Sequence, residues 1–93
     1  MAITPKATLK IVIKKEFFDR IVAKVKTEEF REDVPHWRSR LYDSNNKKKH
    51  FDLIEFINGY QTNARRVITE FKGVTKKGDK FIIGIGKIIK KNF

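Results

Sequence analysis

The feature that most constrains this chain is the alternation of apolar and polar side chains in several short segments. In the segment Thr8–Ile13 every second residue is a large aliphatic one, which is the period of a strand with one buried face. Further strands are predicted from the same pattern and from β-branched and aromatic content, over residues 51–57, 63–71 and 80–90. Such strands bury their apolar faces only when they pair, so a sheet is expected to dominate the fold.

Two helices are expected between the first strands. The apolar residues over 15–25 recur at helical spacing, as Phe17, Phe18, Ile21, Val22 and Val25, which predicts one amphipathic helix. A short second helix is predicted after Asp33 and Pro35, because proline suits the first helical turn and an acid complements the helix dipole. Trp37 and Leu41 are expected to share its inner side.

Short turns and glycines complete the predicted architecture. Asn58-Gly59 is expected to form a tight hairpin turn with Asn58 at positive φ, and a second turn is expected within 75–79. Gly84 and Gly86 share one face of the last strand, where they permit sharp coiling or the close passage of a helix. The eight phenylalanines, with many Ile and Val residues, are expected to supply the core. We therefore predict an α+β fold, a small mixed β-barrel with one main helix and one short helix, in a single domain over 1–93.

A charged segment follows the predicted main helix. Residues 24–31 read Lys-Val-Lys-Thr-Glu-Glu-Phe-Arg, and a strand is expected over 27–31. On that strand Glu29 and Arg31 point to one face while Phe30 points to the other. Lys26 lies where the chain leaves the helix. We expect Lys26, Glu29 and Arg31 to gather in one cleft that suits an anionic, hydrogen-bonding ligand.

The same segment carries a family resemblance. It resembles the G-x-K-x-x-E-x-R signature of ASCH domains, small β-barrels related in fold to the PUA RNA-binding domains. Lys26, Glu29 and Arg31 match the Lys, Glu and Arg of that signature, and Lys24 stands where Gly is usual. Residues 37–41 and 51–60 resemble further stretches of phage and bacterial members. The resemblance runs roughly over 9–89 and implies a PUA-like barrel that binds RNA or a nucleotide.

The three matching residues have distinct expected roles. Arg31 would bind a phosphate or a base edge with its planar guanidinium, and Lys26 would supply a compact positive charge. Glu29 would accept a hydrogen bond from an exocyclic amine such as that of cytosine. The alternative is a surface set of ion pairs that adds little stability and has no function.

The overall charge predicts a polyanionic partner. The chain has 22 Lys and Arg residues against 11 Asp and Glu, a formal charge of +11, which favours nucleic acid first and an acidic protein second. Further candidate phosphate contacts are Arg38, Arg40, Arg65 and Arg66, together with the polar-loop residues Lys47, Lys48 and Lys49. A solvated charged face is the alternative. Tyr60 is a candidate stacking platform for an unpaired base, whereas Trp37 is better explained as a core anchor.

Three classes of function stay open at the level of sequence. The first is an RNA- or nucleotide-binding module. The second is an enzyme, because ASCH proteins include amidohydrolases that act on acylated cytidine and proteins described as ribonucleases. Lys26 matches the amidohydrolase Lys, but Glu29 stands where those enzymes have Thr, so these two are the catalytic candidates if there are any. The third is a small phage-type inhibitor whose basic surface binds an acidic protein.

Composition narrows the remaining possibilities. His36 and His50 lack cysteine partners and metal-ligand spacing, so no metal site is expected, and no motif indicates a cofactor. The chain has no cysteine, which agrees with a reducing compartment. Neither a signal peptide nor a membrane-spanning run is recognisable. A cytoplasmic protein without a membrane partner is therefore expected.

Overall fold

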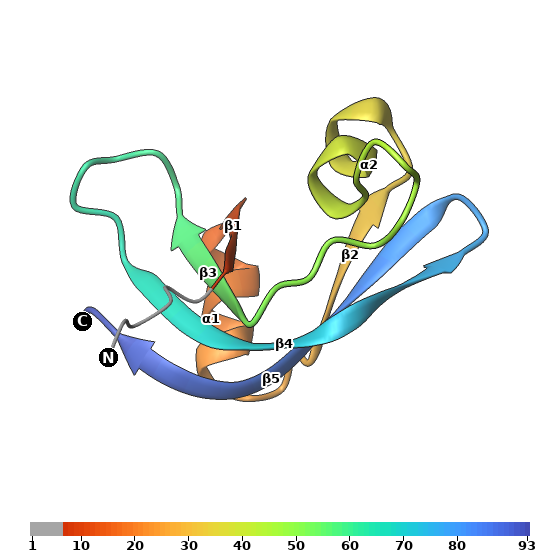
Figure 1. Ribbon diagram of the computed structural model, residues 1–93. Coiled ribbons are helices and arrows are strands. Elements are labelled where there is room, and N and C mark those ends of the chain that lie inside the picture. Colours follow the sequence, from red (N-terminus) through yellow and green to blue (C-terminus); the bar gives the residue numbers. More distant parts are fainter. Residues whose placement is uncertain (1–6) are drawn as a thin grey trace, which may run out of the picture.

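A computed structural model describes residues 7–93, in which a five-stranded sheet curls into a half-barrel accompanied by two helices (Figure 1). The elements follow in the order β1 (Thr8–Ile13), α1 (Lys15–Val22), β2 (Glu28–Glu32), α2 (Pro35–Leu41), β3 (Leu53–Asn58), β4 (Arg66–Lys77) and β5 (Lys80–Lys91). The strand order is β1-β3-β4-β5-β2, with β1 parallel to β3 and every other pair antiparallel. The expected α+β fold with two helices is confirmed, but the helices are nearly equal in length, with eight residues in α1 and seven in α2.

The half-barrel leaves a seam between its two edge strands, β1 and β2. Within the described chain these strands form no ladder with each other; one arginine side chain joins them directly, and a second joins β1 to α2. Arg31 of β2 donates from Nη2 to the backbone oxygen of Val12 at 3.3 Å. Arg40 of α2 donates to the backbone oxygen of Lys10. The seam is thus held by side chains, which leaves room for a cleft between the edges.

The core fills the concave side of the sheet. Its largest fully buried side chains include Phe18 of α1, Phe56 of β3 and Phe81 of β5. Trp37 and Leu41 of α2 are buried as expected, with 9% and 0% of their surface exposed. The prediction that the phenylalanines supply the core is wrong for three of the eight: Phe17, Phe30 and Phe93 are at least 38% exposed. Two of these three turn out to line the cleft described below.

The glycines of β5 allow β4 to approach closely. A Cβ atom at Gly84 would lie 2.9 Å from Cβ of Lys72, and one at Gly86 would lie 2.8 Å from Cβ of Glu70. The pairing of β4 with β5 also shifts register between residues 68 and 74. These irregularities coil the two long strands. The expected sharp coiling is present, and the groups that pass over the glycines are side chains of β4, not a helix.

The main helix is shorter than predicted. It ends at Val22, and Lys24 reverses the chain with a φ of 65°. The backbone N–H groups of Val25 and Lys26 both donate to the carbonyl oxygen of Arg20, which closes the helix end. Val25 is consequently 72% exposed and lies outside the core, so the prediction that it continues the buried face is wrong.

The predicted hairpin at Asn58-Gly59 is also wrong. Asn58 is the last residue of β3 and lacks a positive φ, whereas Gly59 has a φ of 93°. The Asn58 side chain donates to the backbone oxygen of Ile13 at 3.4 Å, which holds it in line with β1. A loop over 59–65 follows, and β4 begins at Arg66. A tight hairpin turn is instead found at Gly78-Asp79, between β4 and β5.

Neither helix within residues 7–93 has the length and apolar character needed to cross a bilayer.

Candidate functional site

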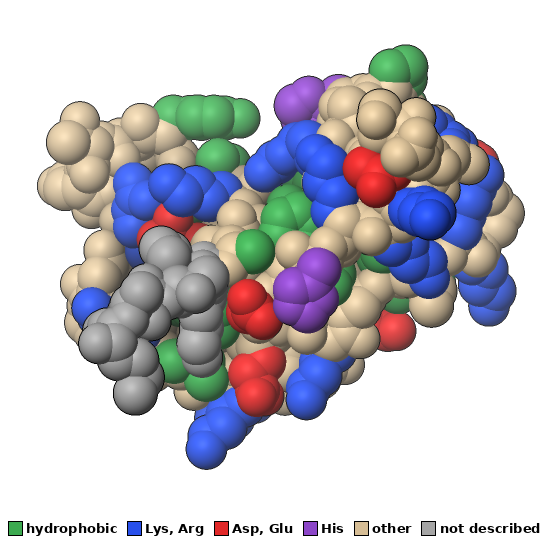
Figure 2. All heavy atoms as spheres, in the orientation of Figure 1, with side chains coloured by type: hydrophobic (Ala, Val, Ile, Leu, Met, Phe, Trp, Pro, Cys, Tyr) green, Lys and Arg blue, Asp and Glu red, His purple; other side chains and the backbone are tan. Residues whose placement is uncertain are grey.

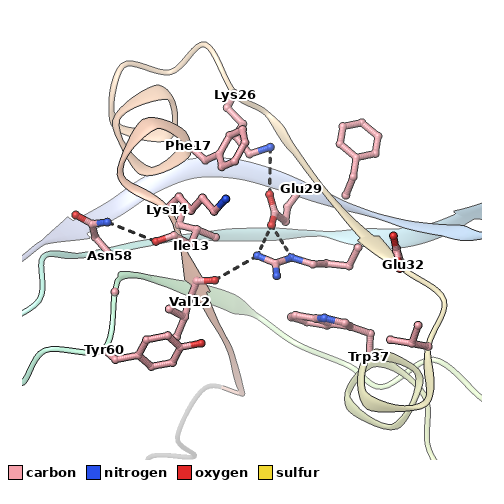
Figure 3. Close-up of a pocket in the computed structure, with 14 residues that line it drawn as sticks. Val12, Ile13, Lys14, Phe17, Lys26, Glu29, Glu32, Trp37, Asn58 and Tyr60 are labelled. Atoms are coloured by element: carbon pink, nitrogen blue, oxygen red, sulfur yellow. Dashed lines mark hydrogen bonds and ion pairs between the residues drawn. The ribbon is translucent and has the colours of Figure 1, made fainter.

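A cleft of about 780 Å³ lies along the seam between β1 and β2, closed at one end by α1 and at the other by α2 (Figure 3). The loop after β3 contributes Gly59 and Tyr60 to its rim. The charged residues that line it are Lys14, Lys26, Glu29, Arg31 and Glu32. The structure therefore brings together the three residues that sequence reasoning grouped, and adds two more charges.

A buried carboxylate lies at the centre of this cleft. The side chain of Glu29 is 8% exposed, and both of its oxygens are held by cations. Oε1 lies 3.1 Å from Nζ of Lys26, and Oε2 accepts from Nε and Nη2 of Arg31 at 2.6 and 2.5 Å. Burial of an acid requires such partners. The pair geometry fixes the carboxylate and the guanidinium as one rigid unit.

Local backbone structure explains why these side chains converge. The alternation of β2 points Glu29 and Arg31 inward, whereas Phe30 is 52% exposed although it also lines the cleft. Lys26 reaches the same place from the turn after α1, where Lys24 adopts the left-handed conformation. The strand period and the turn together bring an ammonium, a carboxylate and a guanidinium to one point.

Aromatic side chains surround the charged centre. The Lys26 ammonium lies 5.5 Å from the ring centroid of Phe17 and 5.8 Å from that of Phe30. The Arg31 guanidinium lies 4.9 Å from the Trp37 ring centroid, within the range of a cation–π contact. Tyr60 stands at the rim with 91% of its surface exposed. The cleft thus offers both flat apolar surfaces and fixed polar groups.

Lys14 is a cleft residue that sequence reasoning missed. It follows β1 directly, and Figure 3 shows its side chain directed toward the middle of the cleft. It forms no ion pair with any residue in the range 7–93. The available signal was its position at the end of an edge strand. Phe17 and Phe30 were missed as lining residues because apolar side chains were assigned to the core.

The four remaining candidate arginines are spread over the molecule, and none of them lines the cleft. Arg40 lies nearest, because its guanidinium stacks on Trp37 at 4.7 Å. Burial, and next the charge of Arg31, lowers the pKa of Arg40. Arg38 pairs with Asp33, at 2.6 Å between Nη2 and Oδ2.

Arg65 and Arg66 lie on the other side of the seam. Arg65 pairs with Asp19 at 2.9 Å and stacks on Phe18 and Phe93. Arg66 pairs with Glu55 at 3.3 Å. Both cations are therefore engaged in contacts within the protein, and their role as phosphate contacts stays a prediction.

The charge of the cleft is small compared with that of the chain. Three cations and two carboxylates line it, although the chain carries +11. Most of the excess positive charge consequently lies outside the cleft. The described residues contain no cluster of three or more His, Asp or Glu side chains that could hold a metal ion.

Comparison with known proteins gives no assignment. No protein-family model matches the chain, and no curated protein matches it in sequence.

Proposed function

We propose that this chain is a small PUA-like, ASCH-type module that binds one unpaired base of RNA, or a single nucleotide, in the cleft between β1 and β2. The observation that carries the proposal is the buried Glu29 carboxylate, held by Lys26 and Arg31 among aromatic rings. A nucleobase presents a flat apolar face and a polar edge. The cleft presents complementary surfaces of both kinds.

The polar centre suits the edge of a base. Glu29 has a fixed orientation, and each carboxylate oxygen has more than one lone-pair direction, so it can accept from an exocyclic amine beside its own cations. Arg31 supplies further guanidinium N–H donors on the same unit. Base edges are read by such fixed donor and acceptor sets. Tyr60, exposed at the rim, is available to stack on the base.

The charge balance also favours a base over a highly charged group inside the cleft. Lys26 and Arg31 both already pair with the Glu29 carboxylate, one at each of its oxygens. Lys14 is the cleft cation without an ion-pair partner in the described chain. A near-neutral ring therefore fits the interior, and its phosphate would lie toward Lys14 or outside.

Catalysis is the weaker reading of the same geometry. Both oxygens of Glu29 already contact protein cations, so the carboxylate is arranged as a recognition group. The amidohydrolases that the signature resembles use a Thr at this position, and this chain has Glu29 there. Product analysis after incubation with N4-acetylcytidine and with RNA tests the enzyme directly. Any turnover that is lost in Lys26→Ala would replace the binding proposal with a catalytic one.

The test of binding is an NMR titration of the labelled protein with the four nucleoside monophosphates. We expect one or more of them to shift backbone resonances of β2, of Lys14 and of the 59–65 loop. Arg31→Ala should weaken that binding by about 1–3 kcal/mol if the guanidinium contacts the base. Arg66→Ala is the matched control, because it also removes one arginine from an Arg–Glu pair, away from the cleft.

The outcomes separate cleanly. Equal losses in Arg31→Ala and Arg66→Ala would mean that only net charge matters, and the cleft assignment would be wrong. Absence of any shift in the cleft with all four nucleotides and with a short RNA would also overturn it. Binding of an acidic protein at the cleft, with no response to nucleotides, would support the inhibitor class instead.

A further inference from the structure

We infer that a surface beside the cleft, formed by residues 33–50 and 76–80 and here called the α2 lobe, binds the phosphate backbone of a single-stranded nucleic acid whose base occupies the cleft. This inference rests on the proposed function. It identifies the ligand as a polynucleotide strand, because a free nucleotide would need the cleft alone. The two segments of the lobe form one body, their positive charge is largely uncompensated, and Trp37 joins them to the cleft.

The two segments of the α2 lobe form one body. The backbone N–H of Asp33 donates to the carbonyl oxygen of Asp79 at 2.8 Å, and Lys76 pairs with Asp33 at 2.7 Å. Tyr42 stacks on Phe81, which follows the hairpin, with ring centroids 5.6 Å apart. Cations from both segments therefore belong to one continuous surface.

The lobe carries a large share of the positive charge. Its 23 residues include eight Lys and Arg and only three Asp, with no Glu. Asp33 is already shared by Arg38 and Lys76, and the Asp43 carboxylate accepts the backbone N–H groups of Asn45 and Lys47. The exposed lysines of the lobe that form no ion pair with any residue in 7–93 are Lys47, Lys48, Lys49, Lys77 and Lys80. Figure 2 shows Lys and Arg side chains gathered over this side of the molecule.

Trp37 links the α2 lobe to the cleft. It belongs to α2 and also lines the cleft. The guanidinium groups of Arg31 and Arg40 both lie against its ring, at 4.9 and 4.7 Å from the centroid. Positive charge therefore continues from the charged centre of the cleft, over Trp37, onto the lobe.

The loop over 59–65, which contributes Gly59 and Tyr60 to the rim of the cleft, lacks such a surface. The loop over 59–65 contains one cation, Arg65, and that guanidinium is paired with Asp19 and donates to Asn58 as well. A nucleic-acid strand with one base in the cleft therefore leaves it more favourably over α2 than over the 59–65 loop. The contacts expected there are with phosphates and carry no base specificity.

The experiment compares two triple variants that remove the same charge. Lys47→Gln/Lys48→Gln/Lys49→Gln neutralises the α2 lobe, and Lys87→Gln/Lys90→Gln/Lys91→Gln neutralises exposed lysines at the end of β5. Affinity for an eight-nucleotide single-stranded RNA is measured against salt concentration by fluorescence anisotropy. Affinity for the best nucleoside monophosphate is measured in parallel by NMR.

The lobe variant should bind the RNA more weakly and with a shallower salt dependence. Since each phosphate contact on a single strand contributes about 0.7 to the slope of log K against log salt, losing three contacts lowers the slope by about 2. The β5 variant should keep the wild-type slope. Both variants should bind the mononucleotide like wild type, because neither touches the cleft.

The two proposals fail in different ways. Equal slopes in both triple variants would overturn the lobe assignment, even with nucleotide binding in the cleft intact. RNA binding that depends on the lobe, without any mononucleotide response, would instead overturn the cleft proposal. A polyaspartate peptide that binds as tightly as the RNA, with the same variant pattern, would show that the lobe binds an acidic polypeptide and would overturn the nucleic-acid assignment.

Discussion

Two arginines of this protein have nearly the same chemical neighbours but lie in different kinds of place. Arg31 pairs with a carboxylate, donates to a backbone oxygen and stacks on Trp37. Arg65 also pairs with a carboxylate, donates to Asn58, and stacks on Phe18 at 4.7 Å. Arg31 lines the cleft of about 780 Å³, and Arg65 is not among the residues that line it.

The difference lies in the carboxylates. The Glu29 side chain is 8% exposed and lies beside a second cation and an open cleft. The Asp19 side chain is 42% exposed within α1. A charge buried beside a cavity costs more folding free energy than a charge at the surface. The presence of the buried Glu29 carboxylate therefore supports a functional role for the cleft. The Arg65 cluster consists of Arg65, Asp19, Phe18 and Phe93. It shows how the same residue types pack where they cover part of the core and do not line the cleft. We use it as the internal control for the predictions below.

The largest expected effect is on stability. Glu29→Gln leaves Lys26 and Arg31 close together without their shared counter-charge, and removal of one partner of a buried ion pair costs about 3 kcal/mol. We expect urea denaturation to show a loss of this order for Glu29→Gln. Asp19→Asn, whose partners can turn toward water, should lose clearly less.

Comparable losses in Glu29→Gln and Asp19→Asn would contradict the distinction between the two sites. The double variant Glu29→Gln/Lys26→Met separates the repulsion between Lys26 and Arg31 from other causes of the lost stability. It removes one of the two uncompensated cations while keeping a similar side-chain length, so it should recover part of the lost stability. No recovery would mean that the Glu29 carboxylate stabilises the fold by other contacts.

The second prediction concerns exposed aromatics. Tyr60 is 91% exposed at the cleft rim, and Phe93 is 53% exposed beside Arg65. Tyr60→Ala should weaken nucleotide affinity by about 1 kcal/mol, or about fivefold, through the loss of base stacking. Its unfolding free energy should stay within about 0.5 kcal/mol of wild type, as is usual for an exposed site. Phe93→Ala should leave affinity unchanged, and the reverse order of effects would move the binding site to the Arg65 cluster.

Sequence reasoning located the charged centre because that information is local. Strand alternation alone places Glu29 and Arg31 on one face, and the start of β2 near Lys26 follows from the end of the helical pattern. The strand Thr8–Ile13 and the short helix from Pro35 were likewise predictable from period and from proline. These features depend on neighbours within a few residues.

The other features of the fold and the cleft depend on contacts between segments that are far apart in the sequence. Asn58 stays in β3 since its side chain reaches Ile13, 45 residues away, and no turn preference encodes that contact. Phe17 and Phe30 line the cleft because the sheet stops short of closing between β1 and β2. The hydrogen bond of Arg65 to Asp19, 46 residues away, is likewise set by the tertiary fold.

The third prediction tests the turn that carries Lys26 into the cleft. Lys24 has a φ of 65°, a conformation that costs a non-glycine residue roughly 1 kcal/mol. Lys24→Gly should raise the unfolding free energy by up to about 1 kcal/mol, less the extra entropy of glycine in the unfolded chain. Lys24→Ala removes the same charge and keeps the strain, so it is the control. Equal stabilities of the two variants would show that the left-handed turn is unstrained.

The smallest expected effect is the acid dependence of the Arg65 cluster. The hydrogen bond from Lys15, and next that from Arg65, lowers the pKa of Asp19 below its usual value of 3.8. Because the folded pKa is the lower one, ionised Asp19 stabilises the fold above pH 3.8, and this contribution is lost as the pH falls through the folded pKa. Asp19→Asn should therefore be less stable than wild type at pH 7, and the difference should disappear toward pH 2. A difference that persists unchanged at pH 2 would mean that the Asp19 side chain acts through packing, and that its ion pair with Arg65 contributes nothing to the fold.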